Sequence, residues 1–115
     1  MQDIFCSIIS GDVPGEFVFR DEKVVVFKDI HPQAPVHLLV VPVRHVEGIG
    51  DADQEMLGIL MSTAHRVAQE QGLVDGYRLI VNDGEHGGKL VPHLHIHVLG
   101  GKHLGPKMVR EGDAI

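Results

Sequence analysis

Three histidines alternate with aliphatic residues towards the C-terminal end of the chain, in the run His93-Leu94-His95-Ile96-His97-Val98. Strict alternation of polar and apolar residues is typical of a half-buried β-strand. Side chains two positions apart in a strand project from the same face. We therefore expect His93, His95 and His97 to share one face, spaced by about 6.5–7 Å per step. The aliphatic residues between them would point into the core.

Three imidazoles on one face have three plausible uses. They could bind a metal ion, because neutral imidazole is a ligand of zinc, copper, nickel and iron. They could carry out covalent and acid–base chemistry on an anionic substrate, with a neutral ring as nucleophile and another ring as proton donor. They could also be solvated groups on a polar strand face. The regular pattern favours a function, but these residues alone leave metal binding and phosphoryl chemistry open.

The histidines follow a loop over residues 83–92 that contains three glycines. Glycine lets backbone N–H groups approach a ligand closely, and successive N–H groups form anion-binding sites. Gly87 and Gly88 are therefore candidates for contact with a phosphate group. Lys89 would add a positive charge to the same site, and His37 could support the three histidines from behind.

Length and composition limit the class of protein. The 115 residues are enough for one domain with a core of its own. The net charge of −6, from 10 basic and 16 acidic residues, argues against general nucleic-acid binding. There is no apolar run long enough to span a membrane and no signal-peptide pattern. Cys6, the single cysteine, fits a reducing compartment. We therefore predict a cytoplasmic protein that binds neither nucleic acid nor a membrane.

Apolar patterning predicts the elements that position the histidines. A short N-terminal helix is expected at residues 3–9, with Asp3 as its cap. One long helix is expected at residues 51–71, capped by Asp51 and ended by Gly72. β-prone segments predict further strands, at residues 16–20, 24–27, 37–41 and 77–82. Together with the histidine strand they give an α+β domain with a five-stranded antiparallel sheet. This single domain spans residues 1–115 and includes a C-terminal tail at 102–115.

The histidine motif resembles the signature of the histidine triad (HIT) family. The resemblance covers nearly the whole chain up to about Gly101, in the order seen in the Hint branch. Its further elements are Ile4-Phe5, Phe27, the run from Asp29 to Pro35, His37 and the aliphatic residues before Pro42, Gly76-Tyr77-Arg78, Asn82, Gly87-Gly88 and Gly100-Gly101. The segment from Gly100 to Pro106 looks most like bacterial Hint-type purine nucleoside phosphoramidases. A HIT-like fold is therefore implied.

The resemblance also implies an activity. Hint-type proteins are homodimers that bind purine nucleotides such as AMP. They cleave nucleoside 5′-phosphoramidates, such as adenosine monophosphoramidates, to a nucleoside monophosphate and an amine. The reaction passes through a nucleotidyl-histidine intermediate and requires no metal ion.

The same resemblance implies roles for individual residues. His95 would attack phosphorus, His97 would contact the phosphate and help to protonate the leaving group, and His93 and His37 would belong to the supporting hydrogen-bond network. The residues that match the substrate site are Asn82, Gly88 and Val91 at the phosphate, Asp29 at the ribose, and Ile4, Phe5, Ile8, Phe27 and Ile30 at the nucleoside.

Two departures from the family pattern bear on these expectations. Lys89 and Leu90 stand where the branch has glutamine and a polar residue, and the Leu90 side chain cannot form hydrogen bonds. Some family members carry a structural zinc ion on an N-terminal Cys-x-x-Cys motif. Here Asp3 occupies the first position, so a zinc site built on Cys6, His45 and His93 is conceivable but not expected.

Three alternatives to the phosphoramidase remain open at this stage. A dinucleoside polyphosphate hydrolase of the Fhit type would use the same nucleophile. A nucleotide-binding regulatory module with little turnover would fit the apolar Leu90. A metalloprotein would use the three histidines as ligands, and activity retained in a chelator would exclude that reading of the catalytic site.

Overall fold

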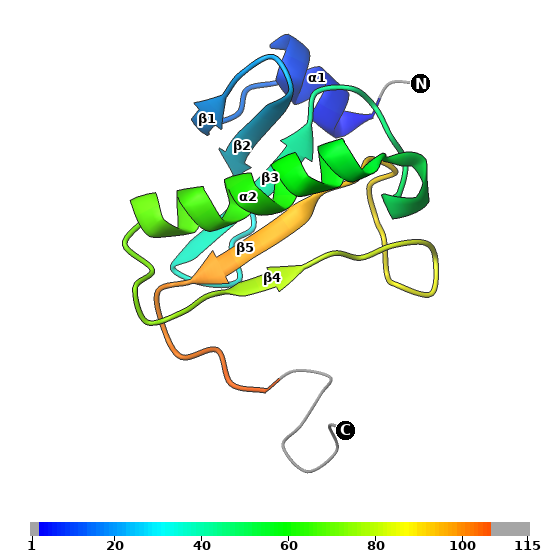
Figure 1. The fold of residues 1–115 in the computed structure, drawn as a ribbon. Helices are drawn as coiled ribbons and strands as arrows, with labels where there is room; N and C mark the ends of the chain where they lie inside the picture. The colour runs from blue at the N-terminus through cyan, green and yellow to red at the C-terminus, as the bar shows by residue number, and fades with distance from the viewer. Residues whose placement is uncertain (1–2, 107–115) are drawn as a thin grey trace.

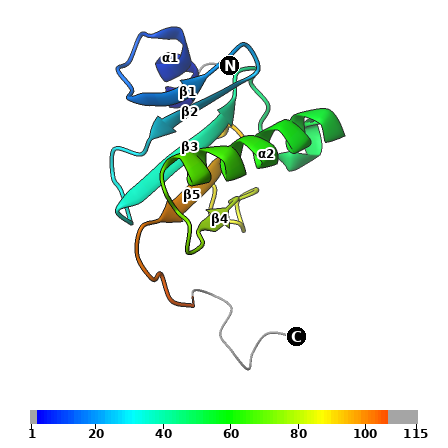
Figure 2. The same ribbon diagram turned by 60° about the vertical axis from the view of Figure 1, so that its left-hand side comes forward.

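The computed structural model describes residues 3–106. Five strands form one antiparallel sheet in the spatial order β1-β2-β3-β5-β4, which can be followed in Figure 2. The strands are β1 (Phe17–Arg20), β2 (Val24–Lys28), β3 (Val36–Pro42), β4 (Arg78–Ile80) and β5 (Ile96–Gly100). This architecture confirms the predicted α+β class with a five-stranded antiparallel sheet.

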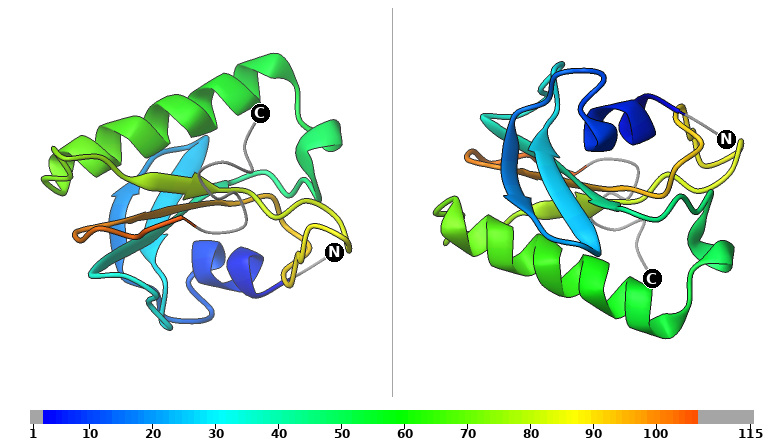
Figure 3. Two further views of the ribbon diagram at one scale, coloured as in Figure 1. Left: turned by 90° about the horizontal axis from the view of Figure 1, so that it is seen from below. Right: turned by 90° about the horizontal axis from the view of Figure 1, so that it is seen from above.

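Two α-helices cover opposite faces of the sheet (Figures 1 and 3). The long helix α2 (Gln54–Glu70) packs its buried residues, such as Leu60 and Val67, on one face. The short helix α1 (Ile4–Ser10) packs Phe5 and Ile8 on the other. The strands between the two helices are therefore buried on both sides, which explains the nearly continuous apolar sequence of β2 and β3.

The register of the two central strands decides which side chains meet on the α1 face. Leu39 of β3 lies opposite His97 of β5, and His37 lies opposite Leu99. Because alternate residues of a strand point to the same side, His37 and His97 project from neighbouring strands on one face. Leu38, in contrast, is buried in the core beneath α2.

The long helix begins later than predicted. Asp51 does not cap it but belongs to a separate 3₁₀ turn (Ile49–Asp51), where its carboxylate accepts the Gly48 N–H at 3.1 Å. The cap is Asp53, whose Oδ1 accepts the Met56 N–H at 2.8 Å. At the other end, Gly72 has a φ of 77°, in the left-handed region that favours glycine after a helix.

The histidine strand is also shorter than predicted. Strand β5 begins at Ile96, and the two residues before it leave the sheet ladder: the Leu94 N–H donates to the Val46 carbonyl, at 2.8 Å. The alternation survives this change, since Leu94 and Ile96 are buried in the α2-side core. A half-buried strand was expected to expose its histidine face to solvent. Instead, His93 and His95 are buried on the α1 side.

Further predictions concern the two ends of the chain and whether it spans a membrane. Asp3 caps α1 as expected, with its carboxylate accepting the Cys6 N–H at 2.8 Å. The predicted tail at 102–115 lies outside the described residues from 107 onwards. Among residues 3–106, no helix combines the length and apolar character needed to cross a membrane.

Candidate active site

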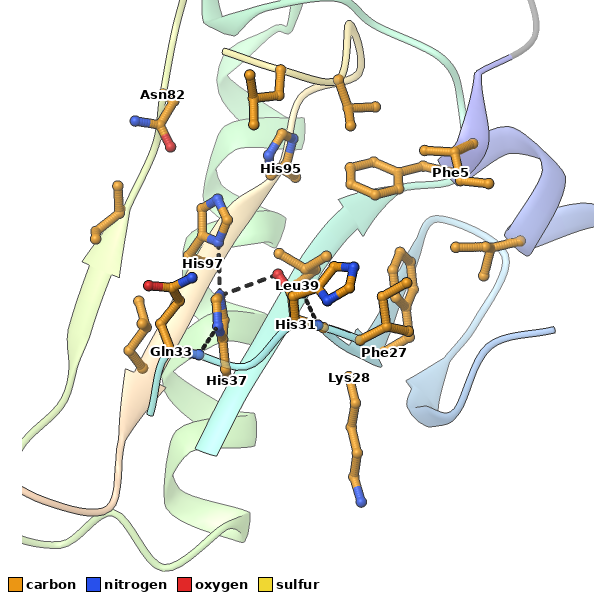
Figure 4. Close-up of a pocket in the computed structure, with 18 of the residues that line it drawn as sticks. Phe5, Phe27, Lys28, His31, Gln33, His37, Leu39, Asn82, His95 and His97 are labelled. Carbon is orange, nitrogen blue, oxygen red and sulfur yellow. Dashed lines mark hydrogen bonds and ion pairs between the residues drawn. The ribbon is translucent and has the colours of Figure 1, made fainter. Parts of the chain in front are cut away.

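A cavity of about 630 Å³ opens on the α1 face of the sheet. His95 and His97 lie in its middle, with Phe5 and Phe27 towards one end and Asn82 towards the other (Figure 4). The cavity therefore has an aromatic end beside α1 and a more polar end beside the glycine-containing loop. The two imidazoles separate these ends.

His95 is oriented by the backbone of its own segment. Its Nδ1 lies 2.6 Å from the carbonyl oxygen of His93. A carbonyl oxygen only accepts hydrogen bonds, so Nδ1 carries the hydrogen and Nε2 keeps its lone pair in the neutral ring. The Phe5 ring meets the imidazole edge to face, with centroids 5.0 Å apart. The structure thus offers one nitrogen of His95 as a nucleophile.

His97 is oriented by a chain of hydrogen bonds that starts at a backbone amide. The Gln33 N–H donates to His37 Nδ1 at 3.0 Å, so neutral His37 carries its hydrogen on Nε2. That nitrogen lies 2.9 Å from His97 Nδ1 and 3.4 Å from the Asp29 carboxylate (Figure 4). His97 Nδ1 therefore accepts, and the hydrogen of neutral His97 is on Nε2. The two histidines of the cavity differ in that one presents a lone pair and the other a donor.

Burial keeps these rings neutral. The pKa of His97 is lowered to about 4, chiefly by burial and also by the neighbouring His95 and His37, while Asp29 acts in the opposite direction. Burial also lowers the pKa of His37, with Asp29 again acting in the opposite direction. The pKa of His95 is lowered by burial in spite of the His93 hydrogen bond. A neutral ring is what nucleophilic attack by His95 requires.

The predicted nucleoside residues gather at the aromatic end. Phe5 and Phe27 pack edge to face with centroids 5.5 Å apart, and Ile30 at the rim is 81% exposed. The predicted substrate residues that line the cavity are Ile4, Phe5, Ile8, Phe27, Asp29, Ile30, Asn82, Gly88 and Val91. An apolar wall with aromatic rings suits a flat heterocycle.

The glycine-containing loop forms the other end. The Asn82 side-chain amide donates to the Gly87 carbonyl at 2.8 Å. Gly88 has a φ of 80° and lines the cavity. Leu90 also lines it and is 93% exposed, so an apolar side chain projects at the mouth.

The structure does not place Lys89 in the cavity, although its neighbours Gly88 and Leu90 line it. The ammonium group instead donates to the Glu47 carbonyl and lies 4.0 Å from the Asp83 carboxylate. The expected contact between Lys89 and a substrate phosphate is therefore not formed by this arrangement. The sequence shows the charge of Lys89 but not the side of the loop on which it lies.

Behind the cavity, four side chains with metal-binding atoms converge: Asp3, Cys6, His45 and His93. Their donor atoms all lie within 4.8 Å of one another, and Cys6 Sγ is 3.6 Å from Nδ1 of both His45 and His93. A tetrahedral zinc ion with bonds of about 2.3 Å to sulfur and 2.0 Å to nitrogen would hold the sulfur and each nitrogen about 3.5 Å apart. The set therefore fits zinc.

His93 is fully buried and links this cluster to the active site. Its Nε2 lies 2.9 Å from the Pro42 carbonyl, which fixes the hydrogen on that nitrogen and turns Nδ1 towards Asp3. Burial alone would raise the pKa of Asp3, but the Cys6 N–H and His93 outweigh it and hold the pKa below its usual range. The Asp3 carboxylate stands where family members with the Cys-x-x-Cys motif carry their first cysteine.

Two contributors were missed by sequence reasoning. Gln33 acts through its backbone N–H, which every residue except proline has, so its side-chain type gives no signal. Asp3 was named only as a substitution that weakens a metal site, and the structure brings its carboxylate among the donor atoms of Cys6, His45 and His93. The Cys-x-x-Cys spacing with aspartate in the first position was a usable signal for that role.

Comparisons with known proteins agree with this geometry. Residues 10–104 match the model of the HIT domain. The chain is 39% identical to the purine nucleoside phosphoramidase of Escherichia coli K12, an alignment that covers 96% of this chain and 97% of the relative. It is 44% identical to a 14 kDa zinc-binding protein of Zea mays, covering 88% and 83%.

A solved structure shows the same fold. A HIT family hydrolase from Clostridium thermocellum superposes with a TM-score of 0.87 at 39% identity, and the match covers 93% of this chain and 96% of that one. Sequence similarity and architecture therefore extend along nearly the full length of both chains. This protein therefore belongs to the histidine triad (HIT) family.

Proposed function

We propose that this HIT family nucleotide hydrolase cleaves purine nucleoside 5′-phosphoramidates to a nucleoside monophosphate and an amine. The observation that carries the proposal is the unprotonated Nε2 of His95, fixed by the bond from Nδ1 to the His93 carbonyl. This nitrogen lies between an aromatic end that suits a purine and a loop end that suits a phosphate. The similarity to a purine nucleoside phosphoramidase supports the choice of substrate.

In the first step, the lone pair of His95 Nε2 forms a bond to phosphorus while the P–N bond breaks. The leaving nitrogen takes the electron pair of that bond and a proton, and departs as an amine. The proton comes from His97, because the anionic phosphoryl group of the bound substrate favours proton uptake by the adjacent ring. The hydrogen bond from His95 Nδ1 to a carbonyl stabilises the positive charge that develops on the nucleophile.

In the second step, water attacks phosphorus and the N–P bond to His95 breaks. His95 recovers its lone pair, and water returns one proton to His97. The nucleoside monophosphate then leaves. No metal ion takes part in either step, since one imidazole supplies the nucleophile and another the proton.

The first test is hydrolysis of adenosine 5′-phosphoramidate in excess EDTA. We expect turnover by the wild-type protein and a loss of roughly 10⁴-fold in His95→Ala, since removing a nucleophile costs on that order. Diadenosine polyphosphates are assayed in parallel, and faster hydrolysis of these than of the phosphoramidate would select the dinucleoside polyphosphate hydrolase. AMP binding without turnover would select the regulatory module, and activity that survives the substitution would exclude His95 as the nucleophile.

We also propose that Asp3, Cys6, His45 and His93 hold a structural zinc ion that the reaction does not need. Such an ion would tie α1 to the segment that carries the triad. The hydrogen bond from His93 Nε2 to Pro42 supports this, because it frees Nδ1 as a ligand atom. Metal analysis of the purified protein should find about one zinc per chain, and an Asp3→Ala variant should hold less.

A homodimer and a cytoplasmic location complete the proposal. Among the described strands, β1 and β4 form the two edges of the sheet, and an edge strand such as β4, which pairs with β5 alone, can pair with a strand of a second copy. Light scattering after size exclusion should give about twice the 12.6 kDa mass of the chain. A monomer at micromolar concentration would contradict the proposed dimer.

A further inference from the structure

The loop at residues 83–89 is held in shape by its own backbone. The N–H groups of Gly87 and Lys89 both donate to the Gly84 carbonyl, each over 3.2 Å. The chain doubles back so tightly that a Cβ on Gly87 would approach the Asp83 carbonyl oxygen to 2.2 Å. These contacts fix the form of the loop, but they do not fix where the loop lies relative to the rest of the protein.

The position of the loop depends on contacts with residues 47–49, which follow β3. The Ile49 N–H donates to Asp83 Oδ1 at 2.9 Å. The Lys89 ammonium donates to the Glu47 carbonyl and lies 4.0 Å from the same carboxylate oxygen. Gly48 is so close that a Cβ there would lie 2.7 Å from Asp83 Oδ1. We refer to these contacts of Lys89 and Asp83 with residues 47–49 as the loop anchor.

Lys89 is held unusually firmly for a lysine on a loop, since only 10% of its side chain is exposed. Lysine has high side-chain entropy and is seldom buried unless its ammonium group is paired. Here the ammonium has a carbonyl and a carboxylate as partners. The preceding residue, Gly88, lines the cavity that His95 also lines.

We propose that Lys89 is a positioning residue that holds the glycine-containing loop against residues 47–49, and thereby fixes the Gly88 backbone at the phosphate end of the cavity. The inference rests on the proposed phosphoryl chemistry. Backbone groups aimed at a reacting phosphate help most when they are already in place before the charge develops. Lys89 therefore acts through the loop and not on the phosphate itself.

This role differs in its consequences from a direct contact with substrate. A lysine that binds the phosphate would change ligand affinity without changing the free protein. A lysine that anchors the loop would change the free protein first. Loss of the anchor should raise the rate at which the loop and residues 47–49 open to solvent, and should lower kcat more than it raises KM.

The test compares Lys89→Met, which removes the donor, with Lys89→Arg, which retains charge and donor. Lys23→Met is the matched control, because Lys23 forms an exposed ion pair with Glu55 on another part of the surface. Amide hydrogen exchange is followed by NMR in the ligand-free protein. We expect the Ile49 amide hydrogen to exchange at least about tenfold faster in Lys89→Met than in the wild type, and at the wild-type rate in Lys23→Met.

Kinetics with adenosine 5′-phosphoramidate and calorimetry with AMP complete the test. We expect Lys89→Met to lower kcat by about tenfold and to change KM by less than about threefold, with Lys89→Arg restoring most of the loss. In the Lys89→Met background, Asp83→Asn should cost little more, because both residues belong to one anchor.

Two results would overturn the proposal. Unchanged exchange in Lys89→Met with a large loss of AMP affinity would place Lys89 on the phosphate. Faster exchange with unchanged kcat would show that the anchor has no part in the reaction. Hydrogen exchange is measured without substrate, so the exchange result does not depend on whether phosphoramidates are the substrate. If Lys89→Met does not fold, the same comparison is made with Lys89→Gln, which keeps a neutral donor.

Discussion

The three histidines of the triad differ in their surroundings because each ring has different hydrogen-bond partners. His93 has one nitrogen on the Pro42 carbonyl and the other on the Asp3 carboxylate, so it is held from both sides. In His95, only Nδ1 has such a partner, the His93 carbonyl. His97 accepts at Nδ1 from His37 and keeps an N–H for the cavity. The alternation aligns the rings, and under the proposed mechanism their hydrogen-bond partners make His93 a structural link, His95 the nucleophile and His97 the proton donor.

At the residue scale, His97→Gln should separate proton transfer from binding. Glutamine cannot deliver a proton as an imidazole can, so we expect kcat for adenosine 5′-phosphoramidate to fall by about 10²–10⁴-fold. AMP affinity, measured by calorimetry, should change by less than about threefold because the walls of the cavity remain. His86→Gln, on the exposed part of the loop, is the control. An unchanged kcat in His97→Gln would remove His97 from the proton transfer.

At the scale of elements, the short helix α1 is a structural part of the site. Phe5 packs against His95 and Phe27, and thus forms the wall between the nucleophile and the aromatic end. A helix of this length has little stability alone. Its position depends on Asp3, whose carboxylate caps the helix and also meets His45 and His93.

Asp3→Ala should therefore cost more than the loss of a cap. We expect the free energy of unfolding to fall by about 1–3 kcal/mol, because the cap is lost together with the contacts of the carboxylate with His45 and His93. Urea denaturation measures the change. Asp12→Ala, which removes an exposed contact with Ser10, should cost less than about 0.5 kcal/mol. Equal effects of the two substitutions would contradict this account of α1.

The two helices and the five strands could be predicted from apolar periodicity, but two of their boundaries could not. Asp51 and Asp53 are both good caps, and only the 3₁₀ turn at Ile49–Asp51 decides between them. The alternation at His93–His95 continues beyond the strand, because burial on two sides does not require the backbone of those residues to pair in the sheet. Pattern shows which way a side chain points, whereas tertiary contacts decide where an element starts.

Much of the candidate site could also be predicted, since residue type limits chemistry. The histidines and glycines were identified from residue type and spacing, whereas Phe5 and Phe27 were expected at the nucleoside only because of the resemblance to the HIT family. The backbone N–H of Gln33 and the direction of Lys89 could not be predicted. Both depend on segments that are distant in sequence or on groups that every residue shares.

At the scale of the whole molecule, the buried imidazoles make stability depend on pH. The pKa of His97 is about 4 in the folded protein, against about 6.5 in an unfolded chain. Between these values the unfolded state binds more protons, so stability falls as the pH drops from about 6.5 towards 4. His37 acts in the same direction, since burial lowers its pKa as well.

We expect the free energy of unfolding to be lower at pH 5 than at pH 7, with about 1 kcal/mol of the difference due to His97, a value reduced for its partial exposure. Urea denaturation at the two pH values measures the difference. The His97→Gln variant should show a smaller difference, since glutamine does not titrate. An equal pH dependence in this variant would assign the effect to other groups.

The measurement that tests the central claim most directly is detection of the covalent intermediate. Wild-type protein is mixed with adenosine 5′-phosphoramidate, quenched within one turnover and analysed by intact-mass and fragment mass spectrometry. The account predicts one adenylyl group per active site, attached to His95 and absent from a His95→Gln variant. An adduct on another residue would contradict nucleophilic catalysis by His95. So would turnover under single-turnover conditions in which no adduct forms at any time point.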